Sequence, residues 1–171
     1  TASNHADHIT CGSGDDTVST GSNSLATSNV VWDGGDGIDT AIIVLNTVST
    51  AADISRFETI EVSAPNGDAV LDVSSSTFSG ATTIRYKGGG GLTLTTSASY
   101  TGLTLDIDVS SGGDIRINNL ASSMVVNLNV DMEATLTLPS INTLTINPSN
   151  YGKTLLSLET DSAYSLTVGN K

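Results

Sequence analysis

The chain has few basic residues, a single cysteine and few aromatic residues, and each shortage excludes a class of protein. Only 6 Lys and Arg stand against 18 Asp and Glu, which gives a formal net charge of −12 over 171 residues. Binding to phosphates needs clustered Lys and Arg, so we expect no nucleic-acid partner. One cysteine, Cys11, excludes an internal disulfide and a zinc site built on several cysteines.

Long apolar runs and helical periodicity are also missing. No run of 18 apolar residues occurs, so we expect no membrane insertion. Aromatic residues make up 4% of the chain, which leaves few platforms for sugar rings. No nucleophile with an oriented base and no acid–base pair stands out. We therefore expect that the protein is not an enzyme.

What the chain does contain is a succession of short runs in which apolar residues alternate with polar ones, a pattern typical of strands. In its second half, apolar residues recur every 10 or 11 positions, at Leu94, Leu105, Ile115, Val126, Leu136, Ile146, Leu156 and Leu166. A fixed short period is typical of repeat architectures. An antiparallel sandwich is one alternative. The regular spacing and the scarce aromatics favour an all-β, parallel β-solenoid (a β-roll or β-helix) with two strands per coil of about 20 residues.

The solenoid hypothesis predicts which residues stack. Leu94, Ile115, Leu136 and Leu156 should lie in one sheet, and Leu105, Val126, Ile146 and Leu166 in the facing one. Residues 42–45 and 57–62 are predicted as further strands, with Phe57, Ile60 and Val62 buried. Residues 53–56 are predicted as a single helical turn.

Two segments near the N-terminus match the nonapeptide G-G-x-G-x-D-x-U-x, in which U is a large apolar residue. Residues 11–19 match at every defined position except the first. Residues 34–42 match at all except the apolar one, where Ala41 is small. Asp7 and Ile9 lie nine residues before their counterparts in the first match. Residues 2–10 are therefore interpreted as a degenerate repeat.

This spacing has a chemical rationale as a calcium site. Glycine permits tight turns with free carbonyl oxygens, and Asp supplies a carboxylate, the oxygen mixture that Ca²⁺ prefers. The predicted ligands are Asp16 and Asp39, then Asp7, Asp15, Asp33 and Asp36, with the turn glycines Gly12, Gly14, Gly35 and Gly37.

Ordinary Gly-Asp turns are the alternative. Two matches in a stretch of 55 residues without Lys or Arg favour calcium. Asp16 and Asp39 are 23 residues apart, which is not a multiple of nine, so we expect an extruded loop around residues 21–29. We accordingly divide the chain into an RTX-like calcium-binding β-roll, residues 1–45, and a β-solenoid continuation, residues 46–171, with a strand period of about ten residues.

The order of residues 12–19, a Ser-rich spacer, residues 34–40 and then residues 57–62 resembles the RTX segments of bacterial surface-layer (S-layer) proteins of the Caulobacter type. The resemblance covers roughly residues 3–65. It implies a right-handed parallel β-roll, type I secretion, an extracellular location on the bacterial cell surface, and calcium-dependent self-association into a lattice. Any attachment to cell-surface polysaccharide would use parts of the protein outside this chain. The alternative is a rigid, calcium-stabilised module of an RTX adhesin or exoprotein.

Two further features have competing interpretations. Asp106 and Asp108 alternate with apolar residues, and Asn127 and Asn129 follow about one coil later. They form either a secondary cation site or, as we favour, a solvated polar face. Thr-x-Thr pairs at 93/95, 135/137 and 143/145 suggest an ice-binding face. We favour the simpler explanation that Thr suits outward strand positions.

Overall fold

The fold was analysed in a computed structural model, which describes residues 8–24, 30–45, 52–65, 67–73, 78–96, 103–109, 115–118, 123–130, 134–138, 143–148, 156–160 and 165–168. Within these ranges no helix is long and apolar enough to cross a membrane. The strands described are β1 (His8–Thr10), β2 (Thr17–Ser24), β3 (Val30–Asp33), β4 (Thr40–Val44), β5 (Ala52–Ser55), β6 (Thr59–Ala64), β7 (Ala69–Val73), β8 (Phe78–Ser79), β9 (Thr83–Gly88), β10 (Leu92–Thr96), β11 (Leu103–Val109), β12 (Ile115–Asn118), β13 (Ser123–Val130), β14 (Ala134–Leu138), β15 (Thr143–Pro148), β16 (Leu156–Thr160) and β17 (Ser165–Val168).

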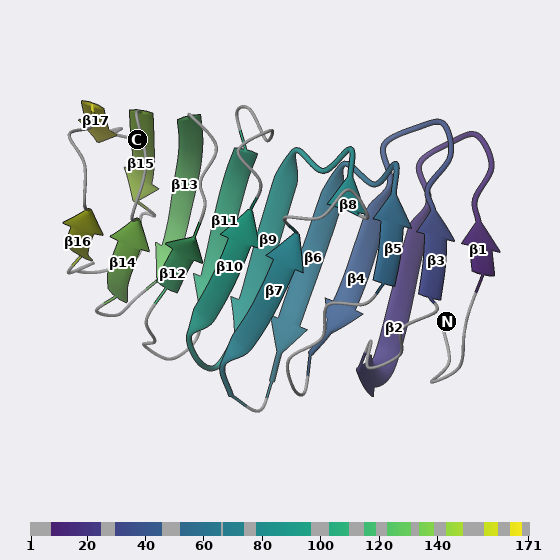
Figure 1. Ribbon diagram of the computed structural model, residues 1–171, viewed down its shortest axis with the longest axis horizontal. Coiled ribbons are helices and arrows are strands. Elements are labelled where there is room, and N and C mark those ends of the chain that lie inside the picture. Colours follow the sequence, from purple (N-terminus) through teal and green to yellow (C-terminus); the bar gives the residue numbers. More distant parts are fainter. Residues whose placement is uncertain are drawn as a thin grey trace.

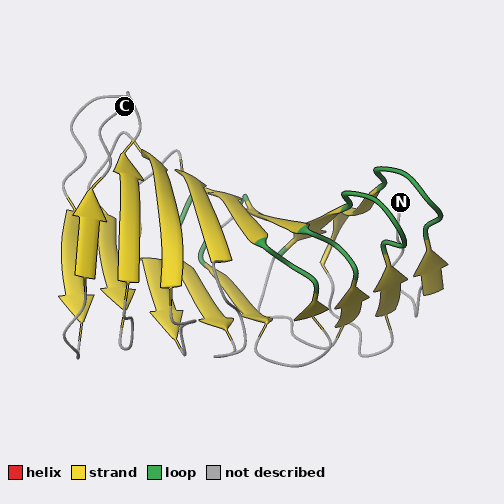
Figure 2. Cartoon of the chain, turned by 90° about the horizontal axis from the view of Figure 1, so that it is seen from above, coloured by secondary structure: helices red, strands yellow, loops and turns green. Residues whose placement is uncertain are grey.

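The strands form three parallel sheets that stack into a β-solenoid, as the sequence predicts. One eight-stranded sheet has the order β17-β15-β13-β11-β9-β6-β4-β2 and spans the length of the molecule (Figure 1). Opposite it lie a five-stranded sheet, β16-β14-β12-β10-β7, and a four-stranded sheet, β1-β3-β5-β8. Figure 2 shows the two layers, with loops crossing between them at the N-terminal end. Every recorded strand pairing is parallel, and neighbouring strands in a sheet come from successive coils.

The predicted division of strands between the sheets is confirmed, and the predicted register is partly wrong. Leu105, Val126 and Ile146 stack in register, but the next residue in this column is Val168, because Leu166 pairs with Leu144. In the facing sheet Leu92, rather than Leu94, pairs with Ile115. Leu136 pairs with Ile115 on one side and with Leu158, rather than Leu156, on the other. Each error is a shift by two residues, which keeps the same face of the strand.

The core is a thin double row of side chains between the layers. Along β4 and β6, buried residues alternate strictly with partly exposed ones, as period-two geometry requires. Phe57, Ile60 and Val62 are buried, as predicted. Trp32, Tyr86 and Phe57 are the largest fully buried side chains of the described chain. The scarce aromatics are therefore concentrated in the core of the first coils.

Two local predictions need correction. Residues 53–56 are not helical: Ala52–Ser55 is strand β5, which pairs with β3 and buries Ile54. The expected loop around residues 21–29 starts later than predicted, because Gly21–Ser24 belongs to β2. The extra residues appear there as a register shift, in which Ser19 pairs with Ile42 while Ser24 pairs with Val44. Residues 25–29 lie outside the described residues.

The outer surface of the long sheet carries an aligned row of threonines. In register across the strands lie Thr17, Thr40, Thr59, Thr83, Thr104, Val125, Thr145 and Thr167. The Thr-x-Thr pair at Thr93 and Thr95 is not aligned in this way, because these residues lie beside Arg116 and Asn118. Stacked threonines stabilise a sheet through cross-strand contacts, which is sufficient reason for the row.

Candidate metal centre

Three turns that join the short N-terminal sheet to the long sheet lie on top of one another. They are Cys11–Asp16 between β1 and β2, Gly34–Asp39 between β3 and β4, and Arg56–Glu58 between β5 and β6. We call them the acidic turn stack. Flanking pairs fix the stacking: Thr17 lies beside Thr40, and Thr40 beside Thr59. The 23-residue spacing of the two motifs is thus one full coil, so the turns stack directly without a nine-residue phase.

Backbone bonds hold the first two turns together. The Asp36 N–H donates to the Gly12 carbonyl at 3.0 Å, and the Gly14 N–H donates to the Asp36 carbonyl at 2.7 Å. Asp15 contributes its side chain, since Oδ1 accepts from the Ile38 N–H at 2.9 Å. Gly35 and Gly37 both have φ in the left-handed region, at 94° and 142°. These bonds and glycines make the turns approach closely.

Asp39 is the central carboxylate of the stack. Its side chain is buried, with 0% exposure of the residue, whereas Asp15 and Asp36 are exposed. Oδ1 accepts from the Asp16 N–H at 2.8 Å, and the Asp39 N–H donates to Oε2 of Glu58 at 2.8 Å. The other oxygen, Oδ2, is buried and has no hydrogen-bond partner among the described residues. A buried carboxylate oxygen without a donor or cation is strongly unfavourable.

Gly34 faces this unpartnered oxygen. A Cβ atom built on Gly34 would lie 2.7 Å from Asp39 Oδ2 and would overlap the Arg56 carbonyl oxygen. The Asp39 carboxylate and the Arg56 carbonyl therefore gather around one point that only glycine leaves open. Two oxygen acceptors at such a place need a donor or a cation near them.

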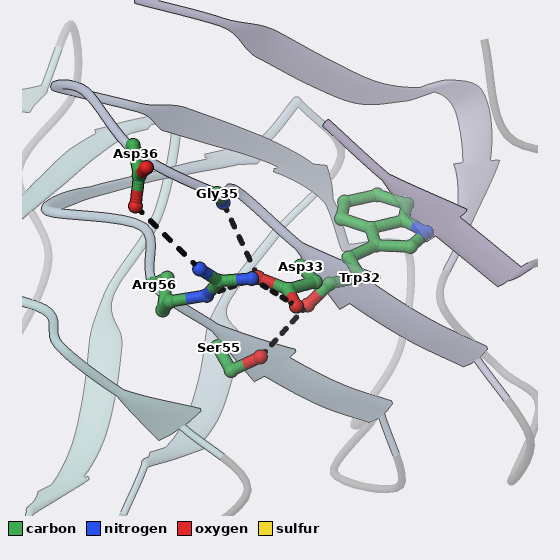
Figure 3. A network of polar contacts seen from close by, with 6 residues as sticks. All are labelled: Trp32, Asp33, Gly35, Asp36, Ser55 and Arg56. Atoms are coloured by element: carbon green, nitrogen blue, oxygen red, sulfur yellow. Dashed lines mark hydrogen bonds and ion pairs between the residues drawn. The ribbon is translucent and has the colours of Figure 1, made fainter. Parts of the chain in front are cut away.

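The third turn is shorter and brings in a positive charge. Arg56 binds Asp33 through two hydrogen bonds of 2.6 Å, from Nε to Oδ1 and from NH2 to Oδ2 (Figure 3). NH1 of Arg56 also lies 3.8 Å from Asp36. The Arg56 guanidinium lowers the pKa of the Asp33 carboxyl, and Asp33 in turn raises the pKa of Arg56.

Cys11 lies among these carboxylates and is partly buried. Burial raises the pKa of its thiol, and the charges of Asp16, Asp39 and Asp33 raise it further. A raised pKa keeps the thiol protonated and weakly nucleophilic. The shift also indicates that three carboxylates act electrostatically on one place.

The stack fits a hard divalent cation held largely by backbone. Within the described part of the chain, no group of three or more His, Cys, Asp and Glu side chains could hold a metal. An ion here would use Asp39 Oδ2 and the Arg56 carbonyl, a carboxylate–carbonyl mixture suited to Ca²⁺. Of the other predicted ligands, Asp16 supplies its N–H to Asp39, while Asp33 binds Arg56. Asp7 lies outside the described residues.

Sequence reasoning missed Arg56 and Glu58 as members of this site. A signal for Glu58 does exist, because an acidic residue, Thr and an apolar residue recur at 16–18, 39–41 and 58–60. The nonapeptide pattern hides it, since the third turn lacks the glycines. Nothing comparable marks Arg56.

The second candidate site on the long sheet carries ion pairs. Asn127 lies beside Asp106, and Asn129 beside Asp108, as predicted. Arg85 approaches Asp106 to 3.8 Å and Glu61 to 3.6 Å, and Lys87 approaches Glu61 to 3.0 Å. Alternating charges across three strands favour the predicted solvated polar face over a cation site.

Comparison of the chain with protein-family models, with curated proteins and with solved structures gave no match. The fold and the site define a parallel β-solenoid with stacked glycine–aspartate turns. The resemblance to surface-layer proteins rests on the motif residues themselves.

Proposed function

We propose that this chain is a calcium-binding structural module of a secreted bacterial cell-surface protein, and that calcium supports its assembly into an S-layer lattice. One observation carries the calcium part: Asp39 Oδ2 is buried without a partner beside the Arg56 carbonyl. A cation there would neutralise the carboxylate and satisfy both oxygens. The assembly part is supported by the resemblance of residues 12–19, 34–40 and 57–62 to surface-layer RTX segments.

The charge of the chain supports a role for a cation in stability. A net charge of −12 disfavours the compact state through self-repulsion. The carboxylates of the first three coils are brought together by folding, so an ion bound there stabilises the folded chain and not the unfolded one. Calcium thus acts as a clamp at one end of the scaffold.

The test is a calcium titration of the whole chain, starting from EGTA, with magnesium as the control ion. Trp32 is the single tryptophan and is fully buried next to Asp33, so its fluorescence reports on the second turn. At 10 to 100 times Kd, calcium should add about 1.4 to 2.7 kcal/mol to the free energy of unfolding. The melting temperature should then rise by about 3 to 10 °C.

Light scattering and electron microscopy of the same samples test assembly. Ordered sheets that form with calcium and dissolve in EGTA would support the lattice. A monomer that stiffens with calcium would support the adhesin or exoprotein alternative. An unchanged melting temperature at several times 10⁻³ M calcium, where extracellular modules bind, would overturn the calcium proposal.

A further inference from the structure

The second turn of the acidic turn stack faces a cation that belongs to the chain itself. Both oxygens of Asp33 bind the Arg56 guanidinium at 2.6 Å, in a bidentate pair, and Asp36 lies 3.8 Å from the same group (Figure 3). Planar guanidinium matches carboxylate geometry and remains charged at any ordinary pH. Arg56 thus gives Asp33 and Asp36 the neutralisation that a metal ion would otherwise give.

The backbone at Arg56 indicates that the side chain is there for a reason. Arg56 has φ of 55°, the only positive φ among the described non-glycine residues. Its counterpart in the next coil is Gly80, with φ of 98°, whose added Cβ would lie 3.3 Å from the Arg56 Cα. A non-glycine residue in this region costs roughly 1–3 kcal/mol. Glycine would fit without strain, so the charged side chain must offset that cost.

The carboxylates of this turn also need more positive charge than one ion at Asp39 provides. Asp33, Asp36 and Asp39 all act electrostatically on Arg56. Arg56 is the first basic residue in a chain that opens with 55 residues free of Lys and Arg. Gathered carboxylates repel one another unless cations lie between them.

We propose that Arg56 is a tethered cation that occupies a second cation position in this turn. The turn then takes one calcium ion at Asp39 and none at Asp33 and Asp36. The Arg56 backbone carbonyl faces the Asp39 oxygen, while its side chain fills the neighbouring position. This inference rests on the proposed calcium function and assigns to Arg56 the choice of how many ions are bound.

The test compares Arg56→Gln with Arg85→Gln. Both changes remove one positive charge, and Arg85 also forms exposed ion pairs, with Glu61 and Asp106 on the long sheet. Bound calcium per chain is measured at saturation by equilibrium dialysis, and melting is recorded in EGTA and in calcium. Arg56→Gly, which relieves the backbone strain, is the second variant, and Asp33→Asn/Arg56→Gln is the rescue.

Arg56→Gln and Arg56→Gly should each bind one more calcium ion than the parent, and Arg85→Gln should bind the parental number. Arg56→Gln should melt below Arg85→Gln in EGTA and reach it in saturating calcium. The double variant should return to the parental count, because the extra carboxylate is gone. Equal counts in all variants, with a calcium effect in the parent, would overturn the inference alone. No calcium effect in the parent would overturn the proposed function and the inference with it.

Discussion

Two stacks of glycine-rich turns with similar composition lie in this solenoid, and they treat their oxygens differently. In the acidic turn stack, Asp39 Oδ2 is buried without a partner. The other stack consists of residues 67–68 before β7 and residues 88–91 before β10, and we call it the tyrosine-closed turn stack. There Asp68 Oδ1 accepts from the Gly91 N–H at 2.7 Å. The Tyr86 hydroxyl lies 3.0 Å from the carbonyls of Gly90 and Gly91 and donates to them.

The difference teaches that a Gly-Asp turn becomes a candidate metal site only when its oxygens are left unsatisfied. Tyr86 is buried and reaches the turn from the strand that precedes it. It supplies the donor that the Gly90 and Gly91 carbonyls need. In the acidic turn stack, the equivalent place beside Asp39 Oδ2 holds another acceptor, the Arg56 carbonyl. The first stack can take a cation, and the second is complete without one.

The largest expected effect comes from filling the space beside the unpartnered oxygen. Gly34→Ala places a methyl group 2.7 Å from Asp39 Oδ2 and onto the Arg56 carbonyl. The backbone cannot retreat, because β3 is paired with strands on both sides. We expect a loss of about 3 kcal/mol or more in the free energy of unfolding, measured by urea denaturation in calcium.

Gly12→Ala is the matched control in the first turn. A Cβ at Gly12 meets no atom within 4 Å, and Gly12 has no positive φ. We expect a change within about 1 kcal/mol. Equal losses for the two variants would mean that space beside Asp39 does not matter.

Asp39→Asn should reverse the sign of the effect between conditions. Without calcium, the amide replaces a buried charge and its Nδ2 can donate to the Arg56 carbonyl, so the variant should be at least as stable as the parent in EGTA. With calcium, it should lack the gain of about 1.4 to 2.7 kcal/mol. Thermal melts of Asp68→Asn serve as the control, because Asp68 already has a donor. A full calcium response in Asp39→Asn would contradict the contrast between the two stacks.

Much of the fold could be predicted from the sequence because one periodicity dominates it. Apolar residues at every second position must face one side, so a shift by one residue would expose the whole core face. A shift by two residues keeps the face. For this reason Leu92 and Leu94 were interchangeable in the prediction, and only the paired backbone decides that Leu92 meets Ile115. The helical turn at residues 53–56 failed because pairing of β5 with β3 overrides local preference.

The site could be predicted as a set of residues but not as an order of importance. The motif treats Asp16 and Asp39 alike, yet only Asp39 is fully buried. Its burial comes from the third coil, where Glu58 binds its N–H and the Arg56 carbonyl faces Gly34. That coil lacks the motif, and its distance of 19 residues from Thr40 to Thr59 is set by the shortened turn. Roles that depend on a neighbouring coil are invisible to a local pattern.

The smallest expected effect tests the tyrosine-closed turn stack. Tyr86→Phe removes the donor to the Gly90 and Gly91 carbonyls and should cost about 1–3 kcal/mol, with the calcium response intact. Burial, with a smaller contribution from Asp68, raises the pKa of Tyr86 to about 12, from an ordinary value of 10. The folded state thus favours the protonated phenol. Its stabilising effect is complete below pH 10 and is lost as the pH rises through about 12. The difference between parent and Tyr86→Phe in urea unfolding should therefore shrink above pH 10, while the other tyrosines titrate equally in both chains. A difference that stays constant through pH 12, or a calcium response lost in Tyr86→Phe, would mean that the hydroxyl does not close this stack independently of the first.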